Sequence, residues 1–207
     1  YTISSTSQMI KGREWDAELL EKLGIPTEKL CDIVKPGTVT GKVKKEICPS
    51  EPPVIAVCSH DTASAVVSVP AKEKDFVYIS CGTWSLFGTE LSEPLIVNEG
   101  KELGYTNEGG YNNTIRYLTN IIGLWLIQET RRELKGKGQN VSFAEMAERA
   151  EKCEALKCII DPGDPSFTKP GDMIVRVKDY LKKTNQYVPE TDNEIFRCIY
   201  ESLALKY

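Results

Sequence analysis

The apolar runs of this chain are short, and turn-forming residues bound most of them. The longest strongly apolar run, Ile121–Ile127, is far shorter than the roughly 20 residues that a membrane-spanning helix requires. Val54–Cys58 follows two prolines and is rich in β-branched residues, a pattern that predicts a buried strand. Phe76–Ser80 is predicted to be a second strand. Each half of the chain is therefore expected to contain a sheet followed by helices.

Helical periodicity, capping residues and breakers predict the remaining elements. The predicted helices are Asp16–Leu23, Thr27–Ile33, Ala63–Val69, Asn120–Lys135, Ser142–Leu156, Met173–Lys183 and a last helix from Thr191. Further strands are predicted at Thr38–Val43 and Trp84–Leu91. Ser142 with Glu145, and Thr191 with Glu194, form the capping-box pattern at two of the helix starts. We expect an α/β fold of two lobes joined near Pro70.

Charge and composition exclude several classes of partner. The 207 residues carry 26 Lys and Arg against 30 Asp and Glu, a formal net charge of −4, so there is no overall positive field for nucleic acid. The first ten residues are polar and lack the basic start and apolar core of a signal peptide. Seven cysteines without a C-x-x-C pair favour reduced, mostly buried thiols. A cytoplasmic location is expected, with neither nucleic acid nor membrane as a partner.

The two ends of the chain do not resemble natural termini. The sequence starts at Tyr1 without a Met, in a segment that has the pattern of a domain interior. It stops at Tyr207 inside a helical pattern, without a Gly, Asn or Pro stop signal. We therefore expect the chain to be a portion of a longer protein.

The sequence lacks several widely used ligand-binding signatures. It contains no G-x-x-x-x-G-K-[ST] phosphate loop, no G-x-G-x-x-G after a strand and no H-E-x-x-H zinc motif. His60 is the one histidine. Together with Cys58 and Asp61 it would place three ligands on one strand end, which makes a poor cage for a metal ion. No metal-ligating residue is predicted.

His60 and Asp61 form the pair most suggestive of chemistry, because they follow the predicted strand Val54–Cys58. Ligands of α/β sheets bind beyond the carboxyl ends of the strands, and an aspartate there can accept a proton from a substrate hydroxyl. The competing interpretation is structural, because Ser59 or Asp61 is well placed to cap the following helix. The pattern alone favours the helix cap, and both interpretations stay open at this point.

Three polar segments are weaker candidates. Ser80–Thr83 joins two predicted strands, and its glycine and threonine can bring backbone and hydroxyl donors to a phosphate; an ordinary hairpin turn is the simpler interpretation. Asn107–Gly110 is expected to be a turn between two short strands. Asn120 and Gln128 lie on roughly one face of the predicted helix, about 12 Å apart along its axis, and ordinary solvent-exposed positions would explain them as well.

Four of these segments, taken together, resemble the FGGY family of carbohydrate kinases. They occur in the order and spacing of that family: Ser59–Ala65 (SHDTASA), Tyr78–Leu86 (YISCGTWSL), Thr106–Gly110 (TNEGG) and Asn120–Glu129 (NIIGLWLIQE). Ser4–Gln8 and Trp15–Asp16 are also similar to the family. The resemblance extends to about Arg132, and within the family it is closest to the kinases that phosphorylate L-rhamnulose. Each motif is weak by itself, whereas four in register are specific.

The resemblance implies an actin-like, ribonuclease-H-like α/β fold in which two lobes enclose a cleft. Residues 1–70 would form the C-terminal part of the first, sugar-binding lobe. Residues 71–207 would form most of the second, ATP-binding lobe, truncated at its end. The implied reaction is the transfer of a phosphoryl group from ATP, with Mg²⁺, to the 1-hydroxyl of L-rhamnulose.

The resemblance also implies roles for individual residues. Asp61 matches the family's catalytic base, which would accept the proton of the sugar hydroxyl. His60 and Thr62, with Asp61, match positions that contact the sugar. Four further residues match positions on the nucleotide side of the family's site: Gly82, Thr83, Asn120 and Gln128.

Some features depart from the family, and alternatives stay open. Cys81 stands where close relatives carry Ser. The family's first phosphate loop would lie before Tyr1 and its glycine-rich adenine segment after Tyr207, so we expect no kinase activity from this chain alone. One alternative is the same fold acting on another sugar, such as L-fuculose or D-xylulose. The other is a non-catalytic module that binds a sugar or a nucleotide, which the aspartate at position 61 disfavours because binding does not need a base.

Overall fold

The computed structural model describes residues 10–11, 14–58 and 60–207. The chain divides into two compact units, which are described separately. Tyr1–Ser80 with Gly88–Thr119 forms the first unit, and Cys81–Phe87 with Asn120–Tyr207 forms the second. Each unit therefore combines two stretches that are separated in the sequence. The expected boundary of the lobes at residue 70 stays a prediction.

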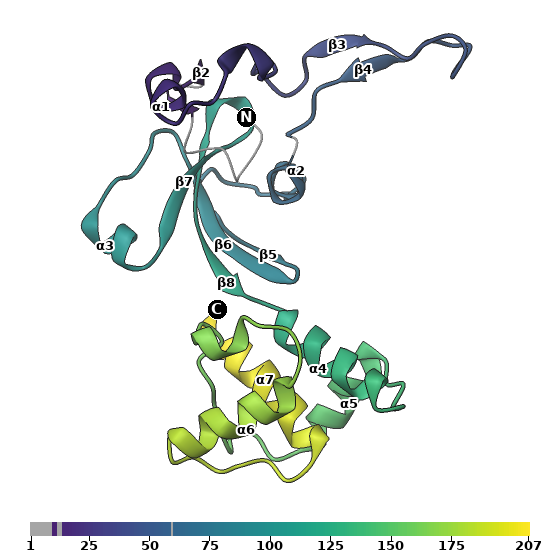
Figure 1. The fold of residues 1–207 in the computed structure, drawn as a ribbon, viewed down its shortest axis with the longest axis vertical. Helices are drawn as coiled ribbons and strands as arrows, with labels where there is room; N and C mark the ends of the chain where they lie inside the picture. Colours follow the sequence, from purple (N-terminus) through teal and green to yellow (C-terminus); the bar gives the residue numbers. More distant parts are fainter. Residues whose placement is uncertain (1–9, 12–13, 59) are drawn as a thin grey trace. The chain divides into compact units, whose positions relative to one another are not determined.

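Short elements dominate the N-terminal part of the first unit (Figure 1). In chain order they are β1 (Ile10–Lys11), β2 (Glu14–Trp15), α1 (Ala17–Lys22), η2 (Thr27–Lys29), β3 (Val39–Lys42), β4 (Pro53–Ile55) and α2 (Asp61–Val67). β1 pairs with β2, and β3 pairs with β4, each in antiparallel orientation. Asp16 caps α1, because its side chain accepts a hydrogen bond from the N–H of Leu19 at 3.0 Å.

The prediction of a buried strand at Val54–Cys58 is wrong. The strand covers Pro53–Ile55, and among the described residues it pairs with β3 alone. Val54 and Ile55 are 44% and 50% exposed, because a two-stranded ribbon has no second layer to cover it. The β-branched residues favour an extended backbone here, whereas burial depends on neighbours that the run itself does not specify.

A four-stranded sheet has the strand order β5-β6-β8-β7. Its strands are β5 (Val77–Cys81), β6 (Trp84–Leu91), β7 (Tyr105–Gly109) and β8 (Ile115–Ile122), with α3 (Asn98–Glu102) and η3 (Tyr111–Asn113) in the connections. β7 and β8 are antiparallel. The predicted turn at Asn107–Gly110 is wrong, because residues 107–109 lie within β7 and pair with β8. The chain reverses after them, where the N–H of Gly110 donates to the carbonyl of Thr114 at 2.8 Å.

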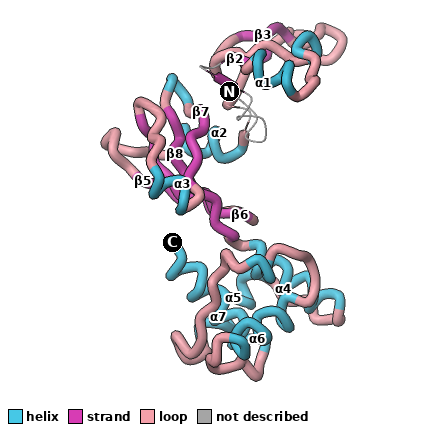
Figure 2. Tube along the Cα trace, turned by 60° about the vertical axis from the view of Figure 1, so that its left-hand side comes forward, coloured by secondary structure: helices cyan, strands magenta, loops and turns pink. Residues whose placement is uncertain are grey.

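Four helices build most of the second unit, and Figures 1 and 2 show them gathered together. They are α4 (Trp125–Gly136), α5 (Phe143–Glu151), α6 (Met173–Lys183) and α7 (Asp192–Lys206), with the short η4 (Pro165–Phe167) between α5 and α6. Their common core contains side chains with no exposed surface, among them Leu126, Met146, Phe167, Val177, Leu181 and Phe196. The capping boxes predicted at the starts of α5 and α7 are confirmed.

Two glutamates of α4 stabilise the start of α6 in place of a local cap. The residue before α6, Asp172, makes no side-chain capping bond. Instead, the carboxylate of Glu129 accepts the N–H of Gly171 and that of Glu133 accepts the N–H of Ile174, each at 3.1 Å. Negative charge is favourable at a helix N-terminus, so these contacts fix α6 against α4 and compensate the burial of Glu129.

The cysteines are all free of disulfide bonds, in agreement with the expected reduced thiols. Their expected burial is confirmed for three of them: Cys58, Cys158 and Cys198. Cys31 and Cys81 are exposed, and Cys48 and Cys153 are intermediate, so the prediction that most of the thiols are buried is wrong.

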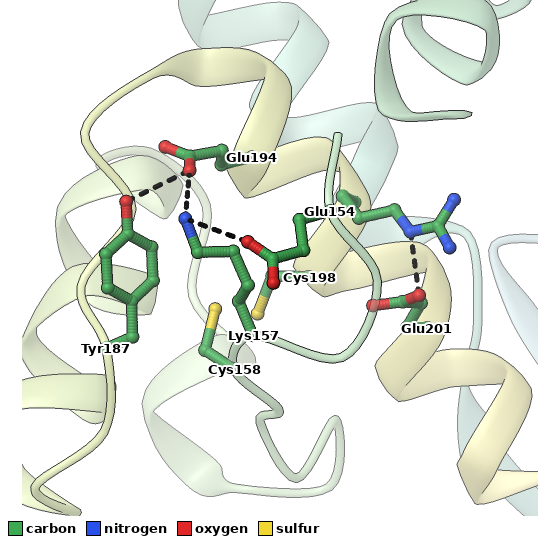
Figure 3. A pocket seen from close by; sticks show the side chains of 8 residues that line it. Glu154, Lys157, Cys158, Tyr187, Glu194, Cys198 and Glu201 are labelled. Atoms are coloured by element: carbon green, nitrogen blue, oxygen red, sulfur yellow. Dashed lines mark hydrogen bonds and ion pairs between the residues drawn. The ribbon is translucent and has the colours of Figure 1, made fainter. Parts of the chain in front are cut away.

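Glu194 joins the start of α7 to the preceding loop and to Lys157. Its carboxylate accepts hydrogen bonds at 3.0 Å from the Lys157 ammonium, the Tyr187 hydroxyl and the N–H of Glu190. Figure 3 shows the Lys157 ammonium between Glu194 and Glu154, beside the Tyr187 ring. The Lys157 hydrogen bond is the main reason that the pKa of Glu194 falls from 4.5 to about 2. Burial acts in the opposite direction.

We expect Glu194→Gln to lower the free energy of unfolding by about 1 to 2 kcal/mol at pH 7, because a charged hydrogen-bond acceptor is lost while the capping acceptor stays. The pKa of Glu194 is depressed in the folded state, so its contribution is complete above about pH 4.5 and disappears as the pH falls toward 2. Urea unfolding at pH 7 and pH 3, followed by helical circular dichroism, measures both values. The exposed Glu190→Gln is the matched control, and an equal deficit at both pH values would contradict the prediction.

Candidate functional site

The predicted sugar-side residues lie at the start of α2. The helix begins at Asp61, and His60 is its N-cap residue without a side-chain capping bond. Asp61 Oδ1 accepts the N–H of Thr62 at 2.7 Å and lies 3.4 Å from His60 Nε2. The position of this carboxylate in the first turn suits the positive end of the helix dipole. The expectation that the side chain of Ser59 or Asp61 caps the helix is not met by Asp61, and Ser59 lies outside the described residues.

These neighbours differ in how far they reach solvent. The Asp61 side chain is 94% exposed, whereas the His60 side chain is 26% exposed and Thr62 is buried. His60 Nδ1 is buried and has no hydrogen-bond partner among the described residues. Asp61 is therefore the member of the group that a solvent-borne ligand reaches directly. The N-terminal motif Ser4–Gln8 lies outside the described residues.

In the second unit, the turn between β5 and β6 lies directly on the start of α4. The carbonyl of Gly82 accepts the N–H of Leu124 at 3.0 Å. The carbonyl of Thr83 accepts the N–H of Gly123 at 3.2 Å and that of Trp125 at 3.1 Å. The first N–H groups of a helix have no partner within the helix, so the turn satisfies them from outside.

Gly123 makes this close approach possible because it has no side chain. A Cβ at this position would lie 2.9 Å from the carbonyl oxygen of Gly82 and closer still to Ser85 Oγ. Both distances are below normal van der Waals contact, and the first involves backbone that cannot rotate away. The glycine therefore fixes how near the turn lies to the helix.

The Thr83 hydroxyl donates a hydrogen bond to Gln128 Oε1 at 3.1 Å. The two residues are 45 positions apart in the sequence, and both were predicted for the nucleotide side of the site. Thr83 is exposed and Gln128 is half-buried. In this contact the one hydroxyl hydrogen of Thr83 is donated to Gln128, so the Gln128 Nε2 hydrogens are the donors that this pair offers to an anionic oxygen.

The prediction that Asn120 and Gln128 share one helix is wrong. Asn120 is an exposed residue of β8, and α4 begins at Trp125. The apolar run Ile121–Ile127 is divided between the end of the strand and the first turn of the helix. A continuous apolar run is compatible with the periodicity of a strand and with that of a helix, so the run does not indicate where the strand ends and the helix begins.

The Thr106–Gly110 segment contributes to the sheet of the first unit. The Asn107 side chain donates to the carbonyl of Leu95 and accepts its N–H, both at 2.9 Å. Glu108 forms a buried ion pair of 2.9 Å with Arg116 on β8. Burial raises the pKa of Tyr78 to about 12, with the charge of Arg116 acting against it. This segment therefore has a structural role in the described residues.

A contact that sequence reasoning missed joins Ser85 to Tyr207. Their hydroxyl oxygens lie 2.5 Å apart, and Ser85 is fully buried. Ser85 lies two residues after Thr83, so the contact acts on the same turn. A serine flanked by apolar residues in a strand, as in the WSLF stretch of β6, is a weak signal of a buried hydrogen bond, and nothing in the sequence identifies its partner.

Within the described ranges, no group of three or more His, Cys, Asp or Glu side chains is arranged to hold a metal ion. Among the same residues, no helix combines the length and the apolar character that crossing a bilayer requires. The predicted sugar-side residues belong to the first unit, and the predicted nucleotide-side residues belong to the second.

Residues 77–207 match the family model described as the FGGY family of carbohydrate kinases, C-terminal domain. The chain belongs to the FGGY family of carbohydrate kinases. It is 42% identical over 213 residues to a rhamnulokinase of Bacteroides thetaiotaomicron, and the aligned region covers 100% of this chain and 43% of the relative. It is 39% identical over 209 residues to a rhamnulokinase of Bacillus subtilis, and the aligned region covers 98% of this chain and 42% of the relative. The chain thus spans about two fifths of the length of these curated relatives.

Solved structures of sugar kinases share the fold. A ligand-bound xylulose kinase from Lactobacillus acidophilus superposes with a TM-score of 0.60 at 19% identity, over 91% of this chain and 38% of the other. A xylulose kinase from Rhodospirillum rubrum gives a TM-score of 0.60 at 14% identity, over 93% and 39%. The expectation of a mixed α/β fold that covers part of a sugar kinase is confirmed.

We expect Gly123→Ala to lower the free energy of unfolding by about 1 to 3 kcal/mol, because the added Cβ forces the turn away from α4. Gly136→Ala, at the far end of α4, is the control, since a Cβ there meets nothing within 4 Å and alanine is the better helix former. Urea unfolding of both variants measures the difference. A Gly123→Ala protein as stable as the Gly136→Ala protein would contradict the close approach.

Proposed function

We propose that the full-length protein containing this chain phosphorylates the 1-hydroxyl of L-rhamnulose with ATP. The observation that carries this proposal is the 39–42% identity to rhamnulokinases over 98–100% of the chain. The chain spans 42–43% of these relatives. We therefore propose that turnover requires residues that the relatives have beyond the matched portion.

We propose Asp61 as the general base of this reaction. The contacts described for its carboxylate involve Oδ1, so Oδ2 is the oxygen that would receive a proton. The side chain is exposed at the start of α2, where a substrate hydroxyl can approach it. As the proton passes to Asp61, the sugar oxygen becomes the nucleophile toward the γ-phosphorus, and ADP leaves. His60, which lies 3.4 Å from Asp61, would help to orient the carboxylate, and Thr62 would shape the sugar pocket from its buried position.

The turn at Gly82 and Thr83 is the proposed contact for the nucleotide phosphates. Its support is geometric, because an exposed threonine hydroxyl lies within hydrogen-bond distance of the Gln128 amide. Gln128 accepts through Oε1, so its Nε2 hydrogens are oriented to donate elsewhere. Asn120, exposed on β8, is proposed as a further polar contact on this side.

Magnesium is the metal that this reaction class uses to neutralise charge on the phosphates. Among the residues that the structure describes, no cluster of three or more His, Cys, Asp or Glu side chains is arranged to hold a metal ion. Mg²⁺ is commonly held by substrate phosphates with one or two carboxylates.

In the full-length protein, we expect Asp61→Asn to lower kcat by about 100- to 10,000-fold, because asparagine keeps the contact to the N–H of Thr62 but cannot accept the proton. A coupled assay of ADP release measures the rate. The exposed Asp75→Asn is the control and is expected to keep wild-type turnover. Near wild-type turnover of Asp61→Asn would exclude Asp61 as the base. Absence of turnover in the wild-type protein would instead favour a non-catalytic binding module.

A sugar panel separates the proposed substrate from its alternatives. We expect kcat/KM for L-rhamnulose to exceed the values for L-fuculose and D-xylulose by at least about tenfold, because a sugar-binding site that hydrogen-bonds several hydroxyls rejects altered stereochemistry. The same ADP-release assay at fixed ATP gives the three values. A preference for either competing sugar would retain the kinase and replace its substrate.

A further inference from the structure

The contact between Ser85 and Tyr207 links the end of the helical unit to the turn that carries Thr83. The hydroxyl oxygens lie 2.5 Å apart across 122 positions of the sequence. Tyr207 follows α7 directly, and its N–H donates to the carbonyl of Leu203 at 3.1 Å, so the tyrosine backbone continues the helix. Ser85 has no exposed surface. Because water does not reach the buried Ser85, loss of the Tyr207 hydroxyl leaves the serine hydroxyl without this partner, although Tyr207 itself is 36% exposed.

This restraint acts on the turn through Ser85. Ser85 Oγ is the nearest atom to the place that a Cβ of Gly123 would occupy. The serine side chain therefore contacts both Gly123 and Tyr207. The carbonyls of Gly82 and Thr83 are bound to the first N–H groups of α4. The turn is therefore fixed from two sides, by the start of α4 and by the end of α7.

We propose that Tyr207 is a positioning residue for the nucleotide-phosphate contact of Thr83. This inference rests on the function proposed above, and it extends that function to a residue outside the phosphate-binding motif. Without the tyrosine hydroxyl, the buried Ser85 loses its hydrogen bond, and the turn gains freedom to move relative to α4. The 3.1 Å contact between Thr83 and Gln128 is then no longer held at one geometry, and binding of the nucleotide weakens.

The loss of the Tyr207 hydroxyl is expected to weaken binding of the nucleotide and not binding of the sugar. The second unit contains all the residues of this argument, namely Ser85, Tyr207, Thr83 and Gln128. The proposed sugar contacts around Asp61 belong to the first unit. Removing the hydroxyl of Tyr207 leaves the acid–base group unchanged. The expected signature is a change in the KM for ATP without a matching change in the KM for the sugar.

The test uses Tyr207→Phe in the full-length protein. We expect the KM for ATP to rise about 3- to 10-fold, the scale of one lost hydrogen bond, and the KM for L-rhamnulose to change by less than about twofold. Tyr187→Phe is the matched control, because it removes a hydroxyl that donates to Glu194 at 3.0 Å in the same unit but not at the turn. Ser85→Ala is expected to reproduce the rise, and the double variant is expected to add nothing to it, since both changes remove one contact.

Hydrogen exchange provides a readout that does not depend on turnover. We expect the backbone amides of residues 81–87 to exchange faster in Tyr207→Phe than in Tyr187→Phe. If the wild-type protein phosphorylates no sugar but this exchange difference is found, the proposed function fails, while the restraint of Tyr207 on the turn is supported. The inference is overturned if the exchange of 81–87 is the same in the two variants, or if an active Tyr207→Phe protein has an unchanged KM for ATP.

Discussion

The close approach of the Gly82–Thr83 turn to the start of α4 is the constraint on which the arrangement of the proposed nucleotide-side residues depends. The first N–H groups of a helix need acceptors from elsewhere, and here the carbonyls of a turn 40 or so residues earlier provide them. The arrangement requires that position 123 carry no side chain. Because the turn is held at its carbonyls, its side chains face outward, and the hydroxyl of Thr83 meets the amide of Gln128.

In the helical unit, buried or half-buried carboxylates likewise accept backbone N–H groups that have no partner within a helix. Glu129 and Glu133 accept backbone N–H groups at the start of α6, and Glu194 accepts those at the start of α7 together with the Lys157 ammonium. Each carboxylate is thus neutralised by donors from a second segment. These charges stabilise the packing of helices against one another, because the donors they satisfy would otherwise be desolvated without a partner.

Sequence reasoning predicted what depends on local chemistry. The capping boxes at Ser142 and Thr191 specify where α5 and α7 begin, and the mixed α/β class follows from short apolar runs beside periodic ones. It failed where neighbours decide the outcome. Ile121–Ile127 fits a strand and a helix equally, so Asn120 was placed in the wrong element, and the exposure of Val54 depends on a layer that its own sequence does not describe.

The candidate site shows the same division. The contact of Asp61 with the N–H of Thr62 is local and follows from the helix start. The contacts of Thr83 with Gln128 and of Ser85 with Tyr207 join residues 45 and 122 positions apart. No rule of sequence spacing predicts such pairs, because intervening segments of different lengths and conformations can bring the same two residues together. Family resemblance supplied the first pair as members of one site, and tertiary structure alone revealed the second.

The ribbon formed by β3 and β4 has a consequence for handling this chain in solution. All residues of both strands are exposed, and the outer edges of a two-stranded ribbon present unpaired N–H and C=O groups. Exposed strand edges are a general template for pairing between chains, and exposed apolar side chains such as those of Val39 and Ile55 favour such pairing. We therefore expect this ribbon, together with the modest net charge of −4, to influence how the chain associates in concentrated preparations.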